Sequence, residues 1–449
     1  MKPVFYEILA NSLVATLTNT LVWFGVTFWV YLQTQSVLAT SVMAGIYLVT
    51  VAVSGFFLGS LVDRYRKKTA LLLSSFCSLG LYGVAYLIYV LTPAAVFANA
   101  SSPMLWSLII VALLGAIAGN LRTIALPTLV TVLIADTERD KANGLVGTVN
   151  GVAFLGASIL SGLAIGFLGM YWMLVIAIVL TVVTILHLWT IAIPEQRIIS
   201  TEAKPNHIDI RGTIQVIRLV PGLFALIFFN CFNNFLGGVF ISLMDAYGLS
   251  LVSVQVWGIV WGVLSLGFIV GGLAIARFGL GKSPLQTMFL ANIVMWIVAM
   301  FFTIQPSIIL LAVGLFVYLC LIPVVEAAEQ LILQTMIPLE RQGRVFGFAQ
   351  SIEQAASPLT AFMIGPIAHF LFIPFMTTGA GVDLIGSWFG TGTDRGIALL
   401  FTLTGLVGLV ITGLAMRSRA YRSLFVNYQR RYANNLRLEA AKHYEVPEA

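Results

Sequence analysis

Long apolar runs, separated by short stretches with charged or turn-forming residues, recur along almost the whole sequence. Runs of about 20 apolar residues are long enough to cross the ~30 Å hydrocarbon core of a bilayer as helices. The pattern therefore predicts membrane-spanning helices joined by short loops, which leave no room for a soluble domain. The predicted spans are 6–33, 38–62, 69–91, 105–134, 143–168, 170–193, 214–246, 252–276, 285–304, 308–337, 345–375 and 396–416.

The composition supports a membrane protein. Hydrophobic residues make up 59% of the 449 positions, charged residues only 9%, and the mean hydropathy is +0.98, whereas soluble domains are roughly half apolar and a quarter charged. The first run is too long for a signal-peptide core and lacks a small-residue cleavage site, so we expect it to be retained as a span. The three cysteines lie inside predicted spans without a pairing pattern, which favours packing roles.

Lysines and arginines predict which side each loop occupies. When the loops are assigned alternately to the two sides, the side with both termini holds 22 of the 24 Lys and Arg residues. The opposite side holds only Arg395, and Arg122 falls within a span. Because basic loops stay on the cytoplasmic side, we expect an even number of spans in the plasma (inner) membrane with both termini in the cytoplasm. The net charge of +6 then fits a membrane surface and not nucleic acid.

The polar stretch 194–213 divides the chain into two groups of six spans that show weak internal likeness. GFFLG, which contains Gly55 and Gly59, is echoed by GFIVG at 267–271, and TERDKANG at 137–144 is echoed by LERQGRVFG at 339–347. Such likeness is typical of transporters built from internal repeats. We expect bundles at 1–193 and 214–416, a cytoplasmic linker at 194–213 and a cytoplasmic tail at 417–449.

The densest charge cluster, GSLVDRYRKK at 59–68, follows the second span. Together with the duplicated six-span halves, it resembles the signature G-x-L-x-D-R-x-x-R-K/R of the major facilitator superfamily. The matching positions are Gly59, Leu61, Asp63, Arg64, Lys67 and Lys68. The resemblance covers residues 1 to 417 and implies twelve helices in two pseudo-symmetric bundles.

The resemblance also implies a role for this loop as a latch that closes the inner face in the outward-open state. We expect gating by Gly59, Asp63, Arg64 and Arg66, with Gly55 and Gly59 permitting close backbone contact. Alternatively, the basic residues, Lys67 and Lys68 above all, only anchor the topology. The second half carries Ile275 and Ala276 at the positions of Asp63 and Arg64, so only the first latch is expected to be intact.

The ionisable residues inside predicted spans that we single out are Arg122, Glu326, Glu329 and Glu353. A charge at mid-bilayer costs at least ~2.5 to 3.5 kcal/mol, so each needs a wet cavity or a partner. Glu326 and Glu329 are three residues apart and share a helical face. Because two carboxylates so close repel each other in a low dielectric, we expect these three glutamates to carry protons, with Arg122 tuning them. The alternative is an ion pair that only fixes helix packing.

Amide and aromatic side chains concentrate in the first, fourth, seventh and tenth spans. In the major facilitator superfamily, which the chain resembles, these spans line the central cavity. We expect them to line a substrate cavity, although amides that link helices and aromatic residues that pack would give the same pattern. The expected cavity residues are Asn11, Asn19, Trp23, Asn120, Asn230, Asn233, Asn234 and Gln330. His187 and His369 are expected to be packing residues.

Within the superfamily the chain resembles the drug-exporter branch that includes macrolide efflux proteins, through VIRLVPGLFALI at 216–227 and GRVFGFAQSIEQAASPL at 343–359. It departs from the proton-coupled exporters at 151–166, GVAFLGASILSGLAIG, which lacks the proline of their GxxxGPxxGG pattern. The stretch NLRTIALP around Arg122 also matches the superfamily motif poorly.

The tail has Tyr421, Leu424, Phe425, Tyr428 and Tyr432 at helical spacing with arginines between them, which predicts a basic amphipathic helix on the inner leaflet or a solvated helix. No phosphate-binding loop, zinc-ligand spacing or nucleophile with a base is visible, so we expect no enzyme, cofactor or metal.

These observations favour a monomeric, proton-coupled exporter of an amphipathic small molecule that works by alternating access. A uniporter or symporter of a metabolite or lipid is the alternative within transport. A non-transporting receptor or scaffold is the alternative outside it, and the costly intramembrane carboxylates argue against it.

Overall fold

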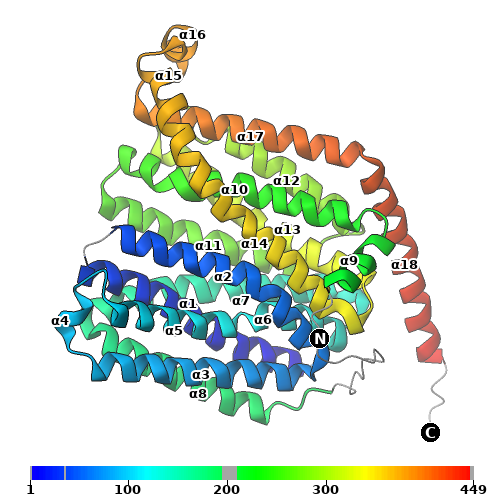
Figure 1. Cartoon of the computed structure of the whole chain (residues 1–449). Coiled ribbons are helices and arrows are strands. Elements are labelled where there is room, and N and C mark those ends of the chain that lie inside the picture. Colours follow the sequence, from blue (N-terminus) through cyan, green and yellow to red (C-terminus); the bar gives the residue numbers. More distant parts are fainter. Residues whose placement is uncertain (1–2, 35–36, 195–209, 445–449) are drawn as a thin grey trace. The chain divides into compact units, whose positions relative to one another are not determined.

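The computed structural model describes residues 3–34, 37–194 and 210–444 (Figure 1). Within these residues the regular structure is helical throughout, which confirms the predicted all-α membrane protein. The helices before residue 195 are α1 Pro3–Thr34, α2 Val37–Arg64, α3 Lys67–Leu91, α4 Ala94–Phe97, α5 Pro103–Gly119, α6 Leu121–Leu133, α7 Arg139–Leu163 and α8 Gly169–Thr190. Those after residue 209 are α9 Ile210–Leu219, α10 Leu223–Leu251, α11 Val254–Phe278, α12 Pro284–Phe301, α13 Ile308–Met336, α14 Gln342–Ile367, α15 Ile373–Thr377, α16 Ala380–Phe389, α17 Thr393–Arg417 and α18 Arg419–Tyr444.

Eleven helical segments of the described chain are long and apolar enough to cross a membrane. One of them, Asp136–Thr190, is 55 residues long and contains both α7 and α8. The chain reverses between these two helices at Gly169, whose φ of 78° is a left-handed conformation that glycine adopts without strain. Counting α7 and α8 separately gives the twelve expected spans.

The chain forms two compact units. Unit 1 comprises Met1–Ala135, Val149–Thr213 and Ile337–Ser351, and unit 2 comprises Asp136–Thr148, Ile214–Met336 and Ile352–Ala449. Each unit thus draws mainly on one half of the sequence and also includes a short segment of the other half. The predicted linker 194–213 lies largely in residues 195–209, outside the described residues.

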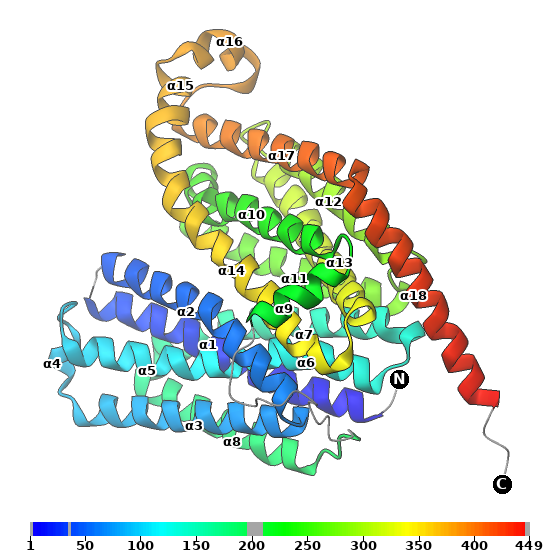
Figure 2. The ribbon, with the colours of Figure 1, turned by 45° about the vertical axis from the view of Figure 1, so that its right-hand side comes forward.

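In unit 1, α1, α3, α5 and α8 pack around a core that includes Val26, Trp29 and Leu108 (Figures 1 and 2). Small residues bring α3 and α5 together, since the hydroxyl of Ser78 donates to the carbonyl oxygen of Gly115 at 2.8 Å. The predicted fourth span is interrupted at Asn120, where α5 ends and α6 begins. Most residues of α6 are buried.

In unit 2, α10, α12, α13 and α17 surround a core rich in aromatic rings, including Phe240, Trp296 and Phe401. The ring of Trp296 fills the space beside Gly408, where any side chain would overlap it. Its indole N–H donates to the Oδ1 of Asn233 at 3.1 Å, so this predicted cavity residue also ties α10 to α12.

The structure differs from the expected elements at two further places. The predicted span 214–246 is two helices, because the chain breaks at Gly222, whose φ is 89°, and separates the short α9 from α10. The loop before the last span contains the helices α15 and α16, which were not predicted. Arg395 holds this loop in place: its guanidinium, 2% exposed, donates to the carbonyl oxygens of Phe389 at 2.6 Å and Ile304 at 2.8 Å.

The tail is helical, as expected, and forms α18. Leu424 and Tyr428 are buried against unit 2, where α18 contacts α10, α13 and α17. Part of the apolar face of the tail helix is therefore covered by unit 2. Burial raises the pKa of Tyr428, whose hydroxyl lies near Thr335, so this hydroxyl keeps its proton at physiological pH.

Candidate transport site

Three glutamates form one acidic cluster in unit 2. Glu326 and Glu329 lie on α13, shortly after Pro323, which lies inside this helix, and Glu353 lies on α14. The Glu329 carboxyl group interacts with the side chains of both Glu353 and Asn230, and Glu326 is near enough to interact with the same carboxylates. The structure thus brings together the three acidic residues that the sequence singled out. Glu329 and Glu353 are half-buried and Glu326 is exposed.

The cluster contains polar atoms whose hydrogen-bonding capacity is unused. One carboxylate oxygen of Glu329, one of Glu353 and both amide atoms of Asn230 are buried without a well-formed hydrogen bond to any described residue. Asn230 is only 4% exposed. Because native proteins pair nearly all buried polar groups, these atoms are suited to receive a proton, a water molecule or a polar group of a ligand.

The other predicted cavity residues of unit 2 have separate roles. Asn233 keeps one buried amide nitrogen without a partner among the described residues, although its oxygen accepts from Trp296. Asn234 is exposed, and its backbone carbonyl accepts from the hydroxyl of Ser357 at 3.4 Å. Gln330 is half-buried on α13, next to Glu329. Only Asn230 joins the acidic cluster directly.

Arg122 is the centre of a polar network in unit 1. It is 3% exposed, and its guanidinium donates to the Oδ1 of Asn11 at 2.9 Å and to the hydroxyl of Ser75 at 3.2 Å. Asn11 in turn donates to the carbonyl oxygen of Thr184 at 2.8 Å and lies 3.4 Å from the Nδ1 of His187. The network links α1, α3, α6 and α8 through neutral acceptors and borders a cavity of about 10 Å³, the size of one water.

The remaining predicted cavity residues of unit 1 meet around two tyrosines that the sequence analysis missed. Trp23 stacks on the ring of Tyr47 with centroids 4.1 Å apart, and the Tyr47 hydroxyl interacts with the side chain of Asn120. The hydroxyl of Tyr82 donates to the Oδ1 of Asn19 at 2.9 Å. A tyrosine inside an apolar span does not stand out in the sequence from the residues around it. Only the structure therefore identifies this cluster.

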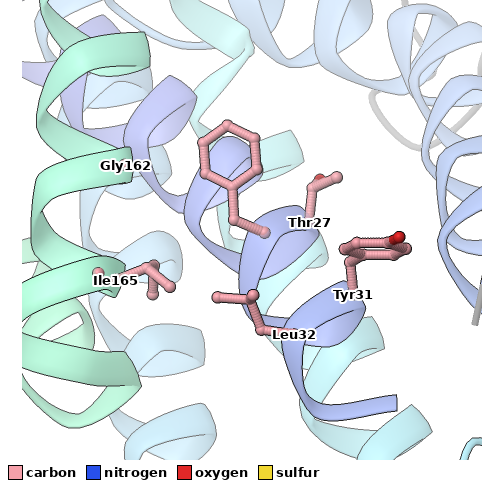
Figure 3. Close-up of a pocket in the computed structure, with 7 residues that line it drawn as sticks. Thr27, Tyr31, Leu32, Gly162 and Ile165 are labelled. Atoms are coloured by element: carbon pink, nitrogen blue, oxygen red, sulfur yellow. The ribbon is translucent and has the colours of Figure 1, made fainter. Parts of the chain in front are cut away.

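A pocket of about 400 Å³ lies between α1 and the end of α7 in unit 1 (Figure 3). Its walls are Thr27, Phe28, Tyr31 and Leu32 of α1, and Gly162, Ile165 and Gly166 on the opposite side. Leu32 points across the pocket toward Ile165 in Figure 3. The helix widens at Ala164–Leu168 into a π-helical turn. The volume and the mostly apolar lining suit one drug-sized molecule.

Asp63, the acidic residue of the predicted latch, contacts the start of α14 in unit 1. The Asp63 carboxylate accepts hydrogen bonds from the backbone N–H groups of Gly343, at 2.7 Å, and Arg344, at 2.8 Å. These two N–H groups lie in the first turn of α14, where the helix dipole favours a negative charge. Any side chain at Gly59 would overlap the carbonyl oxygen of Gly343, so glycine is required for this close approach.

The basic residues of the same loop divide into two groups. Arg64 and Arg66 are exposed. Lys67 is fully buried and donates to the carbonyl oxygen of Val62 at 2.7 Å, and Lys68 donates to that of Ile191 at 2.6 Å. Gly59 and Asp63 are in close contact with the start of α14, and gating by this loop stays a prediction.

Long apolar helices that enclose buried ionisable and amide side chains, with a charged latch at the helix ends, define a membrane transporter. Residues 8–361 match the family model of the Major Facilitator Superfamily, and the chain therefore belongs to this superfamily of transporters. It is not an enzyme.

The chain is 22% identical over 366 residues to macrolide efflux protein A of Streptococcus pyogenes, a match that covers 79% of this chain and 87% of that protein. Its fold is similar to a bacterial homologue of the iron transporter ferroportin in an outward-facing state, with a TM-score of 0.69, 12% identity, and 93% and 100% of the two chains covered. It is also similar to the human organic anion transporter MFSD10, with a TM-score of 0.64, 12% identity, and coverage of 92% and 100%.

Proposed function

We propose that the protein is a proton-coupled exporter of amphipathic small molecules in the plasma membrane, with both termini in the cytoplasm. The observation that carries the proposal is the cluster of Glu329, Glu353 and Asn230 in unit 2, with unused buried polar atoms. The similarity to a macrolide efflux protein supports export of bulky, partly apolar compounds.

Two carboxyl groups in contact within the membrane cannot both stay ionised without a large electrostatic cost. A proton shared between them removes this cost, and so does a positively charged substrate. Proton and cationic substrate then compete for the same carboxylates, which is the basis of exchange. Separately, the pocket between α1 and α7 in unit 1 has the size and the mostly apolar lining that a bulky, partly apolar molecule needs.

Alternating access requires the inner face to open and close. We assign closure to the hydrogen bonds from the first turn of α14 to Asp63, supported by the close approach of Gly59. In this proposal the bundles 1–193 and 214–416 rock against each other, and these contacts break when the inner face opens. Arg122, with its neutral partners, provides a fixed positive charge in the first bundle.

The coupling is tested in inverted membrane vesicles, where an imposed pH gradient drives uptake of a radiolabelled macrolide or of ethidium. We expect Glu329→Gln and Glu353→Gln to lower gradient-driven uptake by about tenfold or more, while exchange of labelled for unlabelled substrate without a gradient continues. Glu340→Gln is the control because Glu340 lies in the turn before α14. Normal gradient-driven uptake in Glu326→Gln, Glu329→Gln and Glu353→Gln alike would refute the assignment.

One observation favours a uniporter or symporter instead. The segment 151–166 of α7 and its π-helical end lacks the proline of the exporter pattern. Measuring proton movement during substrate flux distinguishes the cases, since export by exchange moves protons opposite to the substrate, symport moves them with it, and uniport moves none.

A further inference from the structure

A second close helix crossing lies in unit 2, where the sequence predicted that no latch survives. A side-chain carbon at Gly144 of α7 would come within 2.6 Å of the backbone nitrogen of Ala276 and 2.7 Å of the Ile275 side chain on α11. One at Gly272 would come within 2.6 Å of the backbone nitrogen of Thr148. Ile275 and Ala276 therefore do not replace Asp63 and Arg64 as a latch, but they form the surface on which α7 rests.

Polar contacts from α7 fix this crossing at two further points. The Asp140 carboxylate accepts from the backbone N–H of Leu280 at 3.0 Å, directly after the left-handed Gly279 that ends α11. Asn143 and Gln334 of α13 exchange amide hydrogen bonds of 3.0 and 3.1 Å, and both side chains are buried. The acid of this crossing thus lies at the start of α7, whereas in the first crossing Asp63 lies at the end of α2.

The tail helix holds the same segment from the other side. Asn435 of α18 donates to the Oδ2 of Asp136 at 2.8 Å, and Asp136 also pairs with Arg139. Gln429 donates to the carbonyl oxygen of Lys282, in the turn after α11, at 3.4 Å. The tail is seated by Leu424, whose side chain packs against the backbone of Gly222. It therefore contacts both partners of the crossing, the start of α7 and the end of α11.

We infer that the segment Asp136–Thr148 and the tail helix α18 form a second inner latch, in which Asp140 and Asn435 are positioning residues. The inference rests on the alternating access proposed above. After Thr148, α7 leaves unit 2 and continues in unit 1. Movement of one bundle against the other must therefore release the segment from α11, α13 and α18. The tail sets how tightly the segment is held.

The latch is tested by thiol labelling of purified protein. Thr148→Cys, in a background with Cys77, Cys231 and Cys320 replaced by alanine, places a half-buried thiol against Gly272 that a maleimide should reach faster when the crossing opens. We expect labelling to be about fivefold or more faster with Asn435→Ala or Asp140→Ala added. Asn434→Ala is the matched control, because Asn434 is exposed on the same helix, and should leave the rate unchanged.

Exchanging the side chains of Asn435 and Asp136 tests whether their contact controls the labelling rate or is merely structural. Asn435→Asp places two carboxylates opposite each other and should speed labelling, and adding Asp136→Asn restores a donor and an acceptor and should slow it again. Equal labelling of the Asn435→Ala and Asn434→Ala proteins, with both monodisperse and equally heat-stable, would overturn the inference. The assay uses neither substrate nor pH gradient, so its failure leaves the export proposal standing, and loss of gradient-driven uptake leaves the latch standing.

Discussion

The carboxylate of Asp63 binds the backbone of Gly343, a residue 280 positions further along the chain, through a hydrogen bond of 2.7 Å. The contact joins the end of α2 to the start of α14, within unit 1. It uses both carboxylate oxygens, because Arg344 donates to the second one. A charged acceptor at the start of a helix satisfies N–H groups that have no partner inside the helix.

We predict that Asp63→Asn weakens this contact, because an amide nitrogen facing a backbone N–H cannot accept its hydrogen bond. Hydrogen bonds to charged groups contribute about 1.5 to 3 kcal/mol, so export should fall by about tenfold or more while expression is retained. Arg66→Ala, at an exposed position of the same loop, should retain at least about half of the activity. Substrate efflux from vesicles measures both. Equal activity of the two variants would contradict the role of Asp63.

Gly59→Ala should abolish the close approach of α2 and α14, since the added methyl group would overlap the carbonyl oxygen of Gly343. Gly45→Ala is the matched control in the same helix, because its Cβ would meet nothing within 4 Å. We expect export to be lost in the first variant and unchanged in the second, with both proteins present in the membrane in similar amounts. Full export by Gly59→Ala would show that the crossing is not needed.

Arg122→Lys should lower stability although it keeps the charge. A lysine ammonium cannot reproduce the planar fork that reaches Asn11 and Ser75 together, so at least one buried oxygen loses its donor, at a cost of about 1 to 3 kcal/mol. Thermal unfolding of the purified protein measures the loss. Ser107→Ala, which removes an exposed hydroxyl on α5, is the control. Unchanged melting temperature and export would reduce Arg122 to a replaceable packing residue.

Gly162→Leu should change substrate preference without affecting folding. The position borders the pocket between α1 and α7, and a Cβ added there would meet nothing within 4 Å. The added side chain occupies space that a bulky substrate would use, so we expect the KM for a macrolide to rise about tenfold while kcat and melting temperature stay constant. Gly83→Leu, another glycine with open space, is the control. A similar rise in both variants would exclude the pocket from the substrate path.

Arg395→Ala should destabilise the protein through unit 2. The buried guanidinium serves the carbonyl oxygens of Phe389, Thr303 and Ile304, and its removal leaves these acceptors without their donor. We expect unfolding to be easier by about 3 kcal/mol and the melting temperature to fall by several degrees. Arg417→Ala, at the other end of α17, provides the comparison. A melting temperature equal to that of the unchanged protein would contradict this structural role.

The sequence predicts the helices well because hydropathy in a membrane depends on local composition alone. It also predicts Asp63 and the three glutamates, since an ion in an apolar span is conspicuous and costly. The break at Gly222 was missed because the apolar run continues across it, and a left-handed turn changes direction without changing composition.

The contacts of Asp140 and Asn435 could not be predicted from the sequence. Asp140 meets Leu280 through a backbone N–H, which any residue except proline offers, so the partner carries no sequence signal. Asn435 meets Asp136 across 299 positions. Tyr47 and Tyr82 were missed for a similar reason, because a tyrosine inside a span is equally suited to packing and to hydrogen bonding.

The exchange of segments between the units has a consequence for dividing the gene. A polypeptide that stopped at the linker would lack 337–351 and would present the glycine surface of α2 and an ionised Asp63 without the backbone that covers them. The missing piece exists in every complete copy, so such fragments would pair with the complementary fragment or take the segment from a neighbour. Co-expression of the two pieces should therefore rescue each one from degradation, because each fragment supplies the segment that covers the other.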